Sequence, residues 1–381
     1  MRKFINLDAN ASYGPLPALK PSSILDSDYL NPSSIHRGGQ RAKAAIELAR
    51  DRVRELVGSD SALKVIFTSG ATEALNLALN FPPEVARGRT IVSTTIEHPA
   101  VLAALQRFEK FGGVVRWVAP GRNWEFSEAP FLNALAEKPL LVNLMCVNNE
   151  TGQLLPVAEI SQALRSAGYR GLVLSDAVQA AGKLDLSFAG LGADMLALSG
   201  HKIGALPGVG ALVVGNRTDL EPLVVGGPQE GRLRAGTENV PGIISFGQAA
   251  EYVRQNLAHR LARYAALRDT LEREISARFP DTIINCANTE RVANTSSLTF
   301  PGVNADDLVV ALDLAGIGIS SGSACASGKP EPSHVLLAGG LAPATARSTV
   351  RLSFTAEAAD DELAYCIEKL GDAVERLRGA A

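Results

Sequence analysis

Apolar residues near the start of the chain recur at three- and four-residue steps, the spacing of one face of a helix. The positions that follow this pattern are Ala42, Ile46, Ala49, Val53 and Leu56. Gly58 comes directly after them and supplies a stop signal. The pattern therefore predicts an amphipathic helix over about residues 37–57.

Short runs rich in β-branched and apolar residues then alternate with helical stretches. The predicted strands are residues 64–68, 90–94, 114–118, 140–145, 172–175, 194–198 and 209–214. Alternation of this kind is typical of βα units on a mainly parallel sheet. We therefore expect a large α/β domain.

The pattern changes in the last third of the chain. A long helical stretch over residues 241–276 precedes strands at 296–300, 316–320 and 350–354 and helices at 306–314 and 360–378. This mixture predicts a smaller α+β domain. We assign residues 21–257 to the large domain, and residues 1–20 and 258–381 to the small one.

Composition narrows the class of partner. Hydrophobic residues make up 46% of the chain, charged residues 20%, and the formal net charge is -3. These values are ordinary for a globular protein and give no electrostatic reason to expect nucleic acid or an anionic membrane as partner. The sequence contains no apolar run long enough to span a bilayer and no secretory signal, so we expect a cytoplasmic protein with a small substrate.

The four cysteines lie far apart, at Cys146, Cys286, Cys325 and Cys366, and none belongs to a CxxC pair. This spacing disfavours a disulfide framework and a zinc site. We expect reduced thiols and no metal.

Ligands of α/β sheets bind beyond the carboxyl ends of the strands, so the residues that follow each predicted strand are informative. Ser69, Gly70, Ala71 and Thr72 open a helix whose first amides can hold a phosphate, although a plain capped helix start has the same composition. Asp176 ends an apolar strand, where an ionised carboxylate can keep a heterocyclic nitrogen protonated.

Lys202 follows another predicted strand, within Ser199-Gly200-His201-Lys202. A lysine in such a pocket can form a Schiff base with an aldehyde, whereas most lysines are solvated surface charges. A phosphate-type helix start, an aspartate and a lysine in this order are three groups that pyridoxal phosphate requires. His98 offers a ring to stack on the pyridine and an acid or base group, the alternative being a capping histidine.

Cys325 lies in a stretch of small residues, 320–328, that suits a loop presenting a thiol. Most isolated cysteines are small buried hydrophobes. The apolar surroundings of the other three cysteines favour that interpretation for them. Cys325 is instead a candidate nucleophile, since a nearby lysine or helix start favours the thiolate.

Taken together, these motifs resemble the cysteine desulfurases of the class V aminotransferase family, nearly end to end. The stretches that carry the resemblance are Asn31-Pro32-Ser33-Ser34 with His36, residues 68–73, Glu97-His98, residues 147–152, Asp176 with Gln179, residues 199–202, residues 236–239 and residues 320–325. The resemblance implies the fold-type I transferase fold and pyridoxal 5'-phosphate as cofactor.

The resemblance also implies roles for individual residues. Lys202 would hold the cofactor covalently, Asp176 would pair with its ring nitrogen, and Gln179 would bond its phenolic oxygen. Arg351 would bind the substrate carboxylate, and Asn149 would contact cofactor and substrate. The phosphate would be held by Ala71, Thr72, Ser199 and His201, and by Thr237 of a second subunit, so a homodimer is expected.

The activity implied is conversion of L-cysteine to L-alanine, with the sulfur left on Cys325 as a persulfide. His98 and Lys202 would be the other catalytic residues. The length of the loop around Cys325 resembles the branch that serves iron-sulfur cluster assembly, which implies a scaffold or another sulfur acceptor as partner. Three alternatives remain open: a selenocysteine lyase, another class V aminotransferase, or a sulfur-pathway binding subunit without catalysis.

Overall fold

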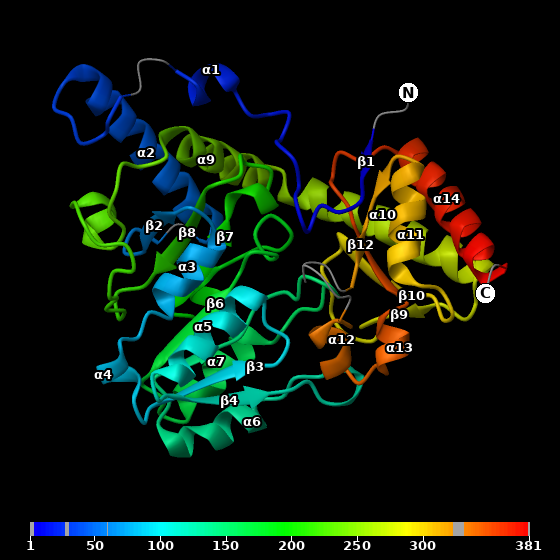
Figure 1. The fold of residues 1–381 in the computed structure, drawn as a ribbon. Coiled ribbons are helices and arrows are strands. Elements are labelled where there is room, and N and C mark those ends of the chain that lie inside the picture. Colours follow the sequence, from blue (N-terminus) through cyan, green and yellow to red (C-terminus); the bar gives the residue numbers. More distant parts are fainter. Residues whose placement is uncertain (1–3, 27–29, 59, 323–330, 380–381) are drawn as a thin grey trace.

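The computed structural model describes residues 4–26, 30–58, 60–322 and 331–379. Its larger unit is built on a seven-stranded sheet (Figure 1). In spatial order the strands are β2 (Lys64–Thr68), β8 (Gly210–Val214), β7 (Met195–Ser199), β6 (Leu172–Asp176), β5 (Leu141–Asn143), β3 (Thr90–Thr94) and β4 (Val114–Val118). All neighbouring pairs from β7 to β4 are parallel, whereas β8 runs antiparallel to both of its neighbours. The predicted α/β fold with a mainly parallel sheet is confirmed.

Both faces of this sheet are buried, as parallel strands require. Along β2, Val65 and Phe67 join the apolar core on one face, and Ile66 joins the core on the other. The helices and 3-10 turns around the sheet are α1 (Pro21–Ile24), α2 (Arg37–Leu56), α3 (Ala71–Ala78), α4 (Pro83–Ala86), α5 (Pro99–Lys110), η1 (Arg122–Trp124), α6 (Ala129–Asn133), η2 (Ala134–Glu137), α7 (Val157–Ser166), α8 (Phe188–Leu191), η3 (Gly200–Lys202), η4 (Gln229–Arg232) and α9 (Val240–Gln255).

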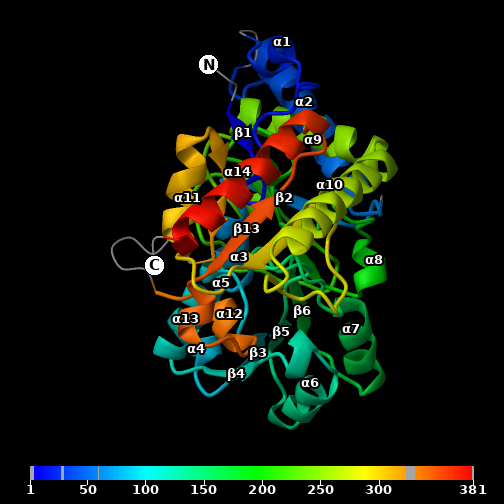
Figure 2. The same cartoon turned by 90° about the vertical axis from the view of Figure 1, so that its right-hand side faces the viewer.

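A four-stranded antiparallel sheet forms a second unit beside the first. Its order is β12 (Ser320–Ser321), β13 (Thr349–Ser353), β10 (Thr295–Thr299) and β9 (Ile283–Ile284). One face is covered by α10 (Leu257–Arg278), α11 (Ala305–Leu314) and α14 (Asp360–Gly379), as Figure 2 shows. Two short helices, α12 (His334–Ala338) and α13 (Pro343–Ala346), complete this unit. The division at residues 20 and 258 stays a prediction.

The N-terminal segment joins this second unit. Strand β1 (Ile5–Asn6) pairs in parallel with β11 (Ile317–Gly318), and Ser353 donates its backbone N–H to the carbonyl of Leu7 at 2.7 Å. Asp8 also forms a bridge with Ser353. The chain after β1 is thereby held against β13, which positions residues 8–12 between the two sheets.

Two predicted elements are wrong in detail. The helix predicted over residues 241–276 is two helices, because Asn256 leaves helical geometry (φ -108°, ψ 13°) and its side chain bonds the carbonyl of Tyr252. The strand predicted over residues 316–320 is β11 and β12, which pair with different sheets. Among the described residues, no helix combines the length and apolar character needed to cross a bilayer.

Candidate active site

Lys202 lies just beyond the carboxyl end of β7, in η3, and Asp176 is the last residue of the neighbouring strand β6. The lysine Nζ donates to the backbone carbonyls of Asn10 at 2.6 Å and Ala11 at 2.8 Å. The segment after β1 therefore holds this amine at the edge where the central strands end. Two residues that the sequence analysis assigned to one site are brought together.

Asp176 is a buried carboxylate. Its Oδ1 accepts the backbone N–H of Val178 at 2.9 Å, and it forms no ion pair within the described ranges. Burial raises the pKa of Asp176, while the interactions with His98, the backbone N–H of Val178 and Lys202 lower it. Such a carboxylate is costly to keep ionised unless a cation lies beside it. The site is therefore suited to a positively charged ring.

The start of α3 lies at the same edge. Thr68, at the end of β2, and Ser199, at the end of β7, are both register partners of Gly210 on β8. A Cβ on Gly210 would lie 2.5 Å from the backbone of Gly70, so only glycine lets β8 pass this turn. The helix has Gly70 as N-cap and no side-chain cap. Its first amides, at Ala71 and Thr72, are left for an anion.

Glu73 fixes this turn from within the first turn of α3. Its Oε2 accepts the backbone N–H of Ser69 at 2.8 Å, and its Oε1 accepts from Arg234 Nε at 3.0 Å. Hydrogen bonds to Arg234 and Ser69 lower the pKa of Glu73 against the effect of burial. His201, one residue before Lys202, has its pKa lowered to about 4 by burial and by the Lys202 charge, and is neutral at neutral pH.

His98 caps helix α5, as the alternative interpretation expected. Its Nδ1 accepts the backbone N–H of Ala100 at 3.1 Å. Burial lowers the pKa of His98, and the nearby Asp176 raises it. A neutral ring whose Nδ1 accepts carries its proton on Nε2. His98 is thus both a cap and a neutral N–H donor close enough to Asp176 and Lys202 to respond to their charges.

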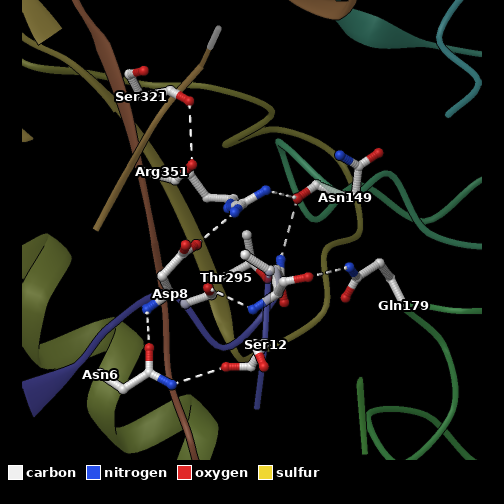
Figure 3. A network of polar contacts seen from close by, with 12 residues as sticks. Asn6, Asp8, Ser12, Asn149, Gln179, Thr295, Ser321 and Arg351 are labelled. Carbon is white, nitrogen blue, oxygen red and sulfur yellow. Dashed lines mark hydrogen bonds and ion pairs between the residues drawn. The ribbon is translucent and has the colours of Figure 1, made fainter. Parts of the chain in front are cut away.

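Arg351 projects from β13 toward the loop that follows β5 (Figure 3). Its Nη2 donates to Asp8 Oδ1 at 2.6 Å, and its Nη1 donates to the backbone carbonyl of Asn149 at 2.9 Å. The Nε is buried without a partner among the described residues. The structure thus brings together both residues predicted to position the substrate.

Asn10 connects these groups and had not been predicted. Its carbonyl accepts from Lys202 and from Gln179 Nε2, the latter at 3.0 Å. Its side chain donates to Thr295 Oγ1 at 2.9 Å and to the carbonyl of Asn149 at 3.3 Å. Asn10 therefore links the large sheet, the small sheet and the loop of Asn149.

One predicted site residue, Thr237, lies apart from this cluster. Thr237 is exposed in the loop before α9, and no hydrogen bond or ion pair among the described residues joins it to the cluster. Its expected role in a second subunit stays a prediction. Cys325 lies outside the described residues. The other three cysteines are buried, and burial raises the pKa of Cys146 to about 12 and that of Cys286 to about 11.

Sequence reasoning missed Asp8, Asn10 and Lys183, and it gave Glu150, within residues 147–152, no role of its own. Asp8 and Asn10 occur in a polar N-terminal loop without periodicity, and Lys183 follows Gln179 by one helical turn in a segment that is not a regular helix. Glu150 is half-buried and accepts a hydrogen bond from the hydroxyl of Ser333, the N-cap of α12. Only the tertiary fold brings these groups together.

Comparison with known proteins agrees with this geometry. The family model "Aminotransferase class-V" matches residues 18–365. A protein named cysteine desulfurase from Enterobacter agglomerans is 37% identical over 379 residues, which is 99% of this chain and 94% of the relative.

Solved structures give the same result. A NifS-like protein from Rickettsia africae ESF-5 superposes with a TM-score of 0.88 at 28% identity and covers 98% of this chain and 99% of its own. A structure titled "SspA in complex with cysteine" superposes with a TM-score of 0.79 at 29% identity. It covers 94% of this chain and 100% of its own. The chain therefore belongs to the aminotransferase class-V family, whose members are pyridoxal-phosphate-dependent enzymes.

Proposed function

We propose that this chain is a cysteine desulfurase that takes sulfur from L-cysteine and carries it on Cys325. The observation that supports this most is the placement of Lys202 beside the buried Asp176, at the strand edge that also holds the start of α3. The relatives named cysteine desulfurase favour this activity over that of a selenocysteine lyase or a general aminotransferase.

The residues present fit pyridoxal phosphate. Asp176 is buried and forms no ion pair in the part of the chain that is described, which suits a protonated ring nitrogen. The amides of Ala71 and Thr72 lack a side-chain cap, which suits a phosphate. Ser199 and His201 flank the same edge. An amine, an anion site and a carboxylate are thus available in one place.

In this proposal Lys202 holds the cofactor covalently and Asp176 keeps its ring nitrogen protonated. When bound, the cofactor withdraws electrons from the substrate Cα. Lys202 also moves the Cα proton, because an amine released beside the substrate can act as a base. The neutral His98 carries its proton on Nε2 and donates it as an N–H hydrogen-bond donor. Its Nδ1 continues to accept the backbone N–H of Ala100 at the start of α5.

Substrate orientation falls to Arg351 and Asn149. A guanidinium binds a carboxylate through two parallel hydrogen bonds, which fixes direction as well as position. Arg351 is held by Asp8 and by the Asn149 carbonyl, so its plane is set before substrate binds. This arrangement reduces the entropy lost on binding.

Cys325 supplies the nucleophile. Its thiolate attacks the sulfur of the bound cysteine, the Cβ–S bond breaks, and a S–S bond forms. The electron pair of the broken bond remains with the substrate carbon, which takes protons and leaves as alanine. L-cysteine and the Cys325 thiol thus give L-alanine and a Cys325 persulfide, with no outside oxidant.

The persulfide must then pass to a sulfur acceptor, for which we propose a scaffold protein of iron-sulfur cluster or thio-cofactor assembly. We also propose a homodimer in which Thr237 reaches the phosphate bound by the partner. The exposure of Thr237 on the surface supports this arrangement.

The test is turnover of L-cysteine with a reductant, followed as alanine and sulfide in equal amounts. Cys325→Ala should lose sulfide release, and Lys202→Ala should lose both activity and the visible colour of the cofactor. Cys286→Ala, at a buried cysteine outside the cluster, is the matched control and should keep the parent rate. Full sulfide release by Cys325→Ala would contradict the proposed nucleophile.

A further inference from the structure

Lys183 is a buried lysine that the proposed chemistry leaves unused. It lies in the segment that follows β6, and its side chain is among the largest fully enclosed side chains of the structure. Its Nζ donates to Asn10 Oδ1 at 3.0 Å and to Gln179 Oε1 in a short contact. Asn294 Nδ2 donates to the same Asn10 oxygen at 3.0 Å.

No carboxylate pairs with Lys183 within the described part of the chain. Burial lowers the pKa of Lys183 well below its ordinary value, and the charges of Lys202, Arg351 and Arg260 act in the same direction. Burying a charged amine costs free energy, so Lys183 differs from an ordinary solvated surface lysine. Its two hydrogen bonds among the described residues both go to side-chain amide oxygens, so its role is to donate to them.

These bonds determine which way the Gln179 amide points. The Oε1 faces the Lys183 amine, and the Nε2 faces the carbonyl of Asn10. If the amide were turned over, its oxygen would face the Asn10 carbonyl, two acceptors without a proton between them, and the N–H of Lys183 would lose its acceptor on Gln179. The chemistry of the two partners therefore fixes the donor end of Gln179 on the side of Asn10.

Lys202, the lysine proposed to hold the cofactor, lies on this same side of Gln179, next to Asn10. Lys202 Nζ donates to the same Asn10 carbonyl as Gln179 Nε2 does. The two nitrogens thus converge on a single oxygen atom, while Lys183 holds the other end of the glutamine away from it. The donor that Gln179 can offer to a group bound on Lys202 depends on this restraint.

We propose that Lys183 is a positioning residue that fixes the amide of Gln179, so that its Nε2 is presented as a hydrogen-bond donor to the phenolic oxygen of the cofactor. The inference rests on the proposed function, since it assumes that the cofactor is bound on Lys202. A donor at a phenolic oxygen stabilises its negative charge and makes that oxygen a poorer proton acceptor. Lys183 thereby adjusts the proton affinity of the bound cofactor without touching it.

The test is a pH titration of the visible absorbance of the purified holoenzyme, compared with the Lys183→Met variant. Loss of the restraint makes the oxygen more basic, so the midpoint should rise by about 0.5 to 1 pH unit. Gln179→Ala should give a similar rise, and the double variant should rise no further than Gln179→Ala alone. Lys64→Met, at an exposed lysine, is the control and should keep the parent midpoint.

A parent midpoint in Lys183→Met, with a raised midpoint in Gln179→Ala, would overturn the inference. So would a double variant in which the two shifts add. Parent midpoints in both single variants would overturn it as well, but L-cysteine turnover would then leave the proposed function standing. A colourless parent without turnover overturns the proposed function, and this inference with it.

Lys183→Gln guards against failure of the methionine variant to fold. Its side chain is one bond shorter, so a polar group stays in the buried position while the bond to Gln179 is lost. The midpoint should rise as in Lys183→Met. An unchanged midpoint in a folded Lys183→Gln holoenzyme would count against the inference.

Discussion

The carboxylate of Asp8 lies 2.6 Å from Nη2 of Arg351, although 343 positions separate the two residues in the chain. Arg351 is buried, and Asp8 is the ion-pair partner that the structure gives it (Figure 3). A buried guanidinium requires such a counter-charge. In the proposed function the carboxylate of a bound amino acid would approach the same cation, so Asp8 and the substrate would both balance its charge.

We expect Asp8→Asn to lower the free energy of unfolding of the substrate-free protein by about 1 to 3 kcal/mol, because Arg351 loses its counter-charge. L-alanine carries the substrate carboxylate without a thiol, and should stabilise the variant more than the parent. Thermal unfolding with and without L-alanine measures both effects. Asp281→Asn, which breaks a more exposed ion pair with Arg378, should change little. Equal stabilisation of parent and Asp8→Asn by L-alanine would be the contrary result.

The two roles of His98 can be separated by substitution. Asparagine is also a good N-cap, so His98→Asn should retain the stability of the parent within about 0.5 kcal/mol, whereas His98→Ala should lose about 1 kcal/mol. Both variants lose the ring, and both should lower kcat/KM for L-cysteine on the order of 100-fold or more. Denaturant unfolding and steady-state kinetics give the two readouts. If His98→Asn kept full activity, the cap would be the whole function of this residue.

The raised pKa values of Glu97 and Glu150 lead us to expect an unusual dependence of stability on pH. Burial raises the pKa of each to about 7 from an ordinary 4.5. A carboxyl whose pKa is higher in the folded state binds its proton more tightly there, so stability is greatest at low pH and is lost as the pH rises through the interval from 4.5 to about 7. Each group contributes up to about 3 kcal/mol to this loss.

Glu97→Gln and Glu150→Gln should each reduce this slope, which denaturant unfolding of the apoprotein at several pH values measures. Glu137 is a control of opposite character, because Arg116 lowers the pKa of this exposed carboxyl. Glu137→Gln should leave the slope between pH 4.5 and 7 as in the parent. A parent protein that gains stability over this interval would refute the assignment of these two groups.

The large sheet could be predicted from sequence because its strands are short apolar runs whose burial is a local property. The strands at 64–68, 90–94 and 114–118 agree with β2, β3 and β4 in every residue. The prediction of one helix over residues 241–276 was wrong because the apolar spacing continues through the break at Asn256. Asn256 ends α9 by its own side-chain bond to Tyr252, a local competition that periodicity does not register.

The candidate site was predictable only in part. Asp176 and Lys202 follow strands, and that position alone marks them. Asn10 and Lys183 carry no such signal, because their roles come from contacts across 173 positions of the chain. The cost of burying Lys183 becomes visible only when the fold encloses it. Long-range polar networks of this kind are therefore found from the structure and not from the pattern of the sequence.

The central claim is that the amine of Lys202 and the thiol of Cys325 act on one bound cysteine. Mass spectrometry of the holoenzyme after brief incubation with L-cysteine tests it most directly, with peptides mapped to each of the four cysteines. The account predicts one added sulfur atom on the Cys325 peptide, none on the peptides of Cys146, Cys286 and Cys366, and no addition in Lys202→Ala. Sulfur added to another cysteine instead, or to Cys325 equally in Lys202→Ala, would contradict it.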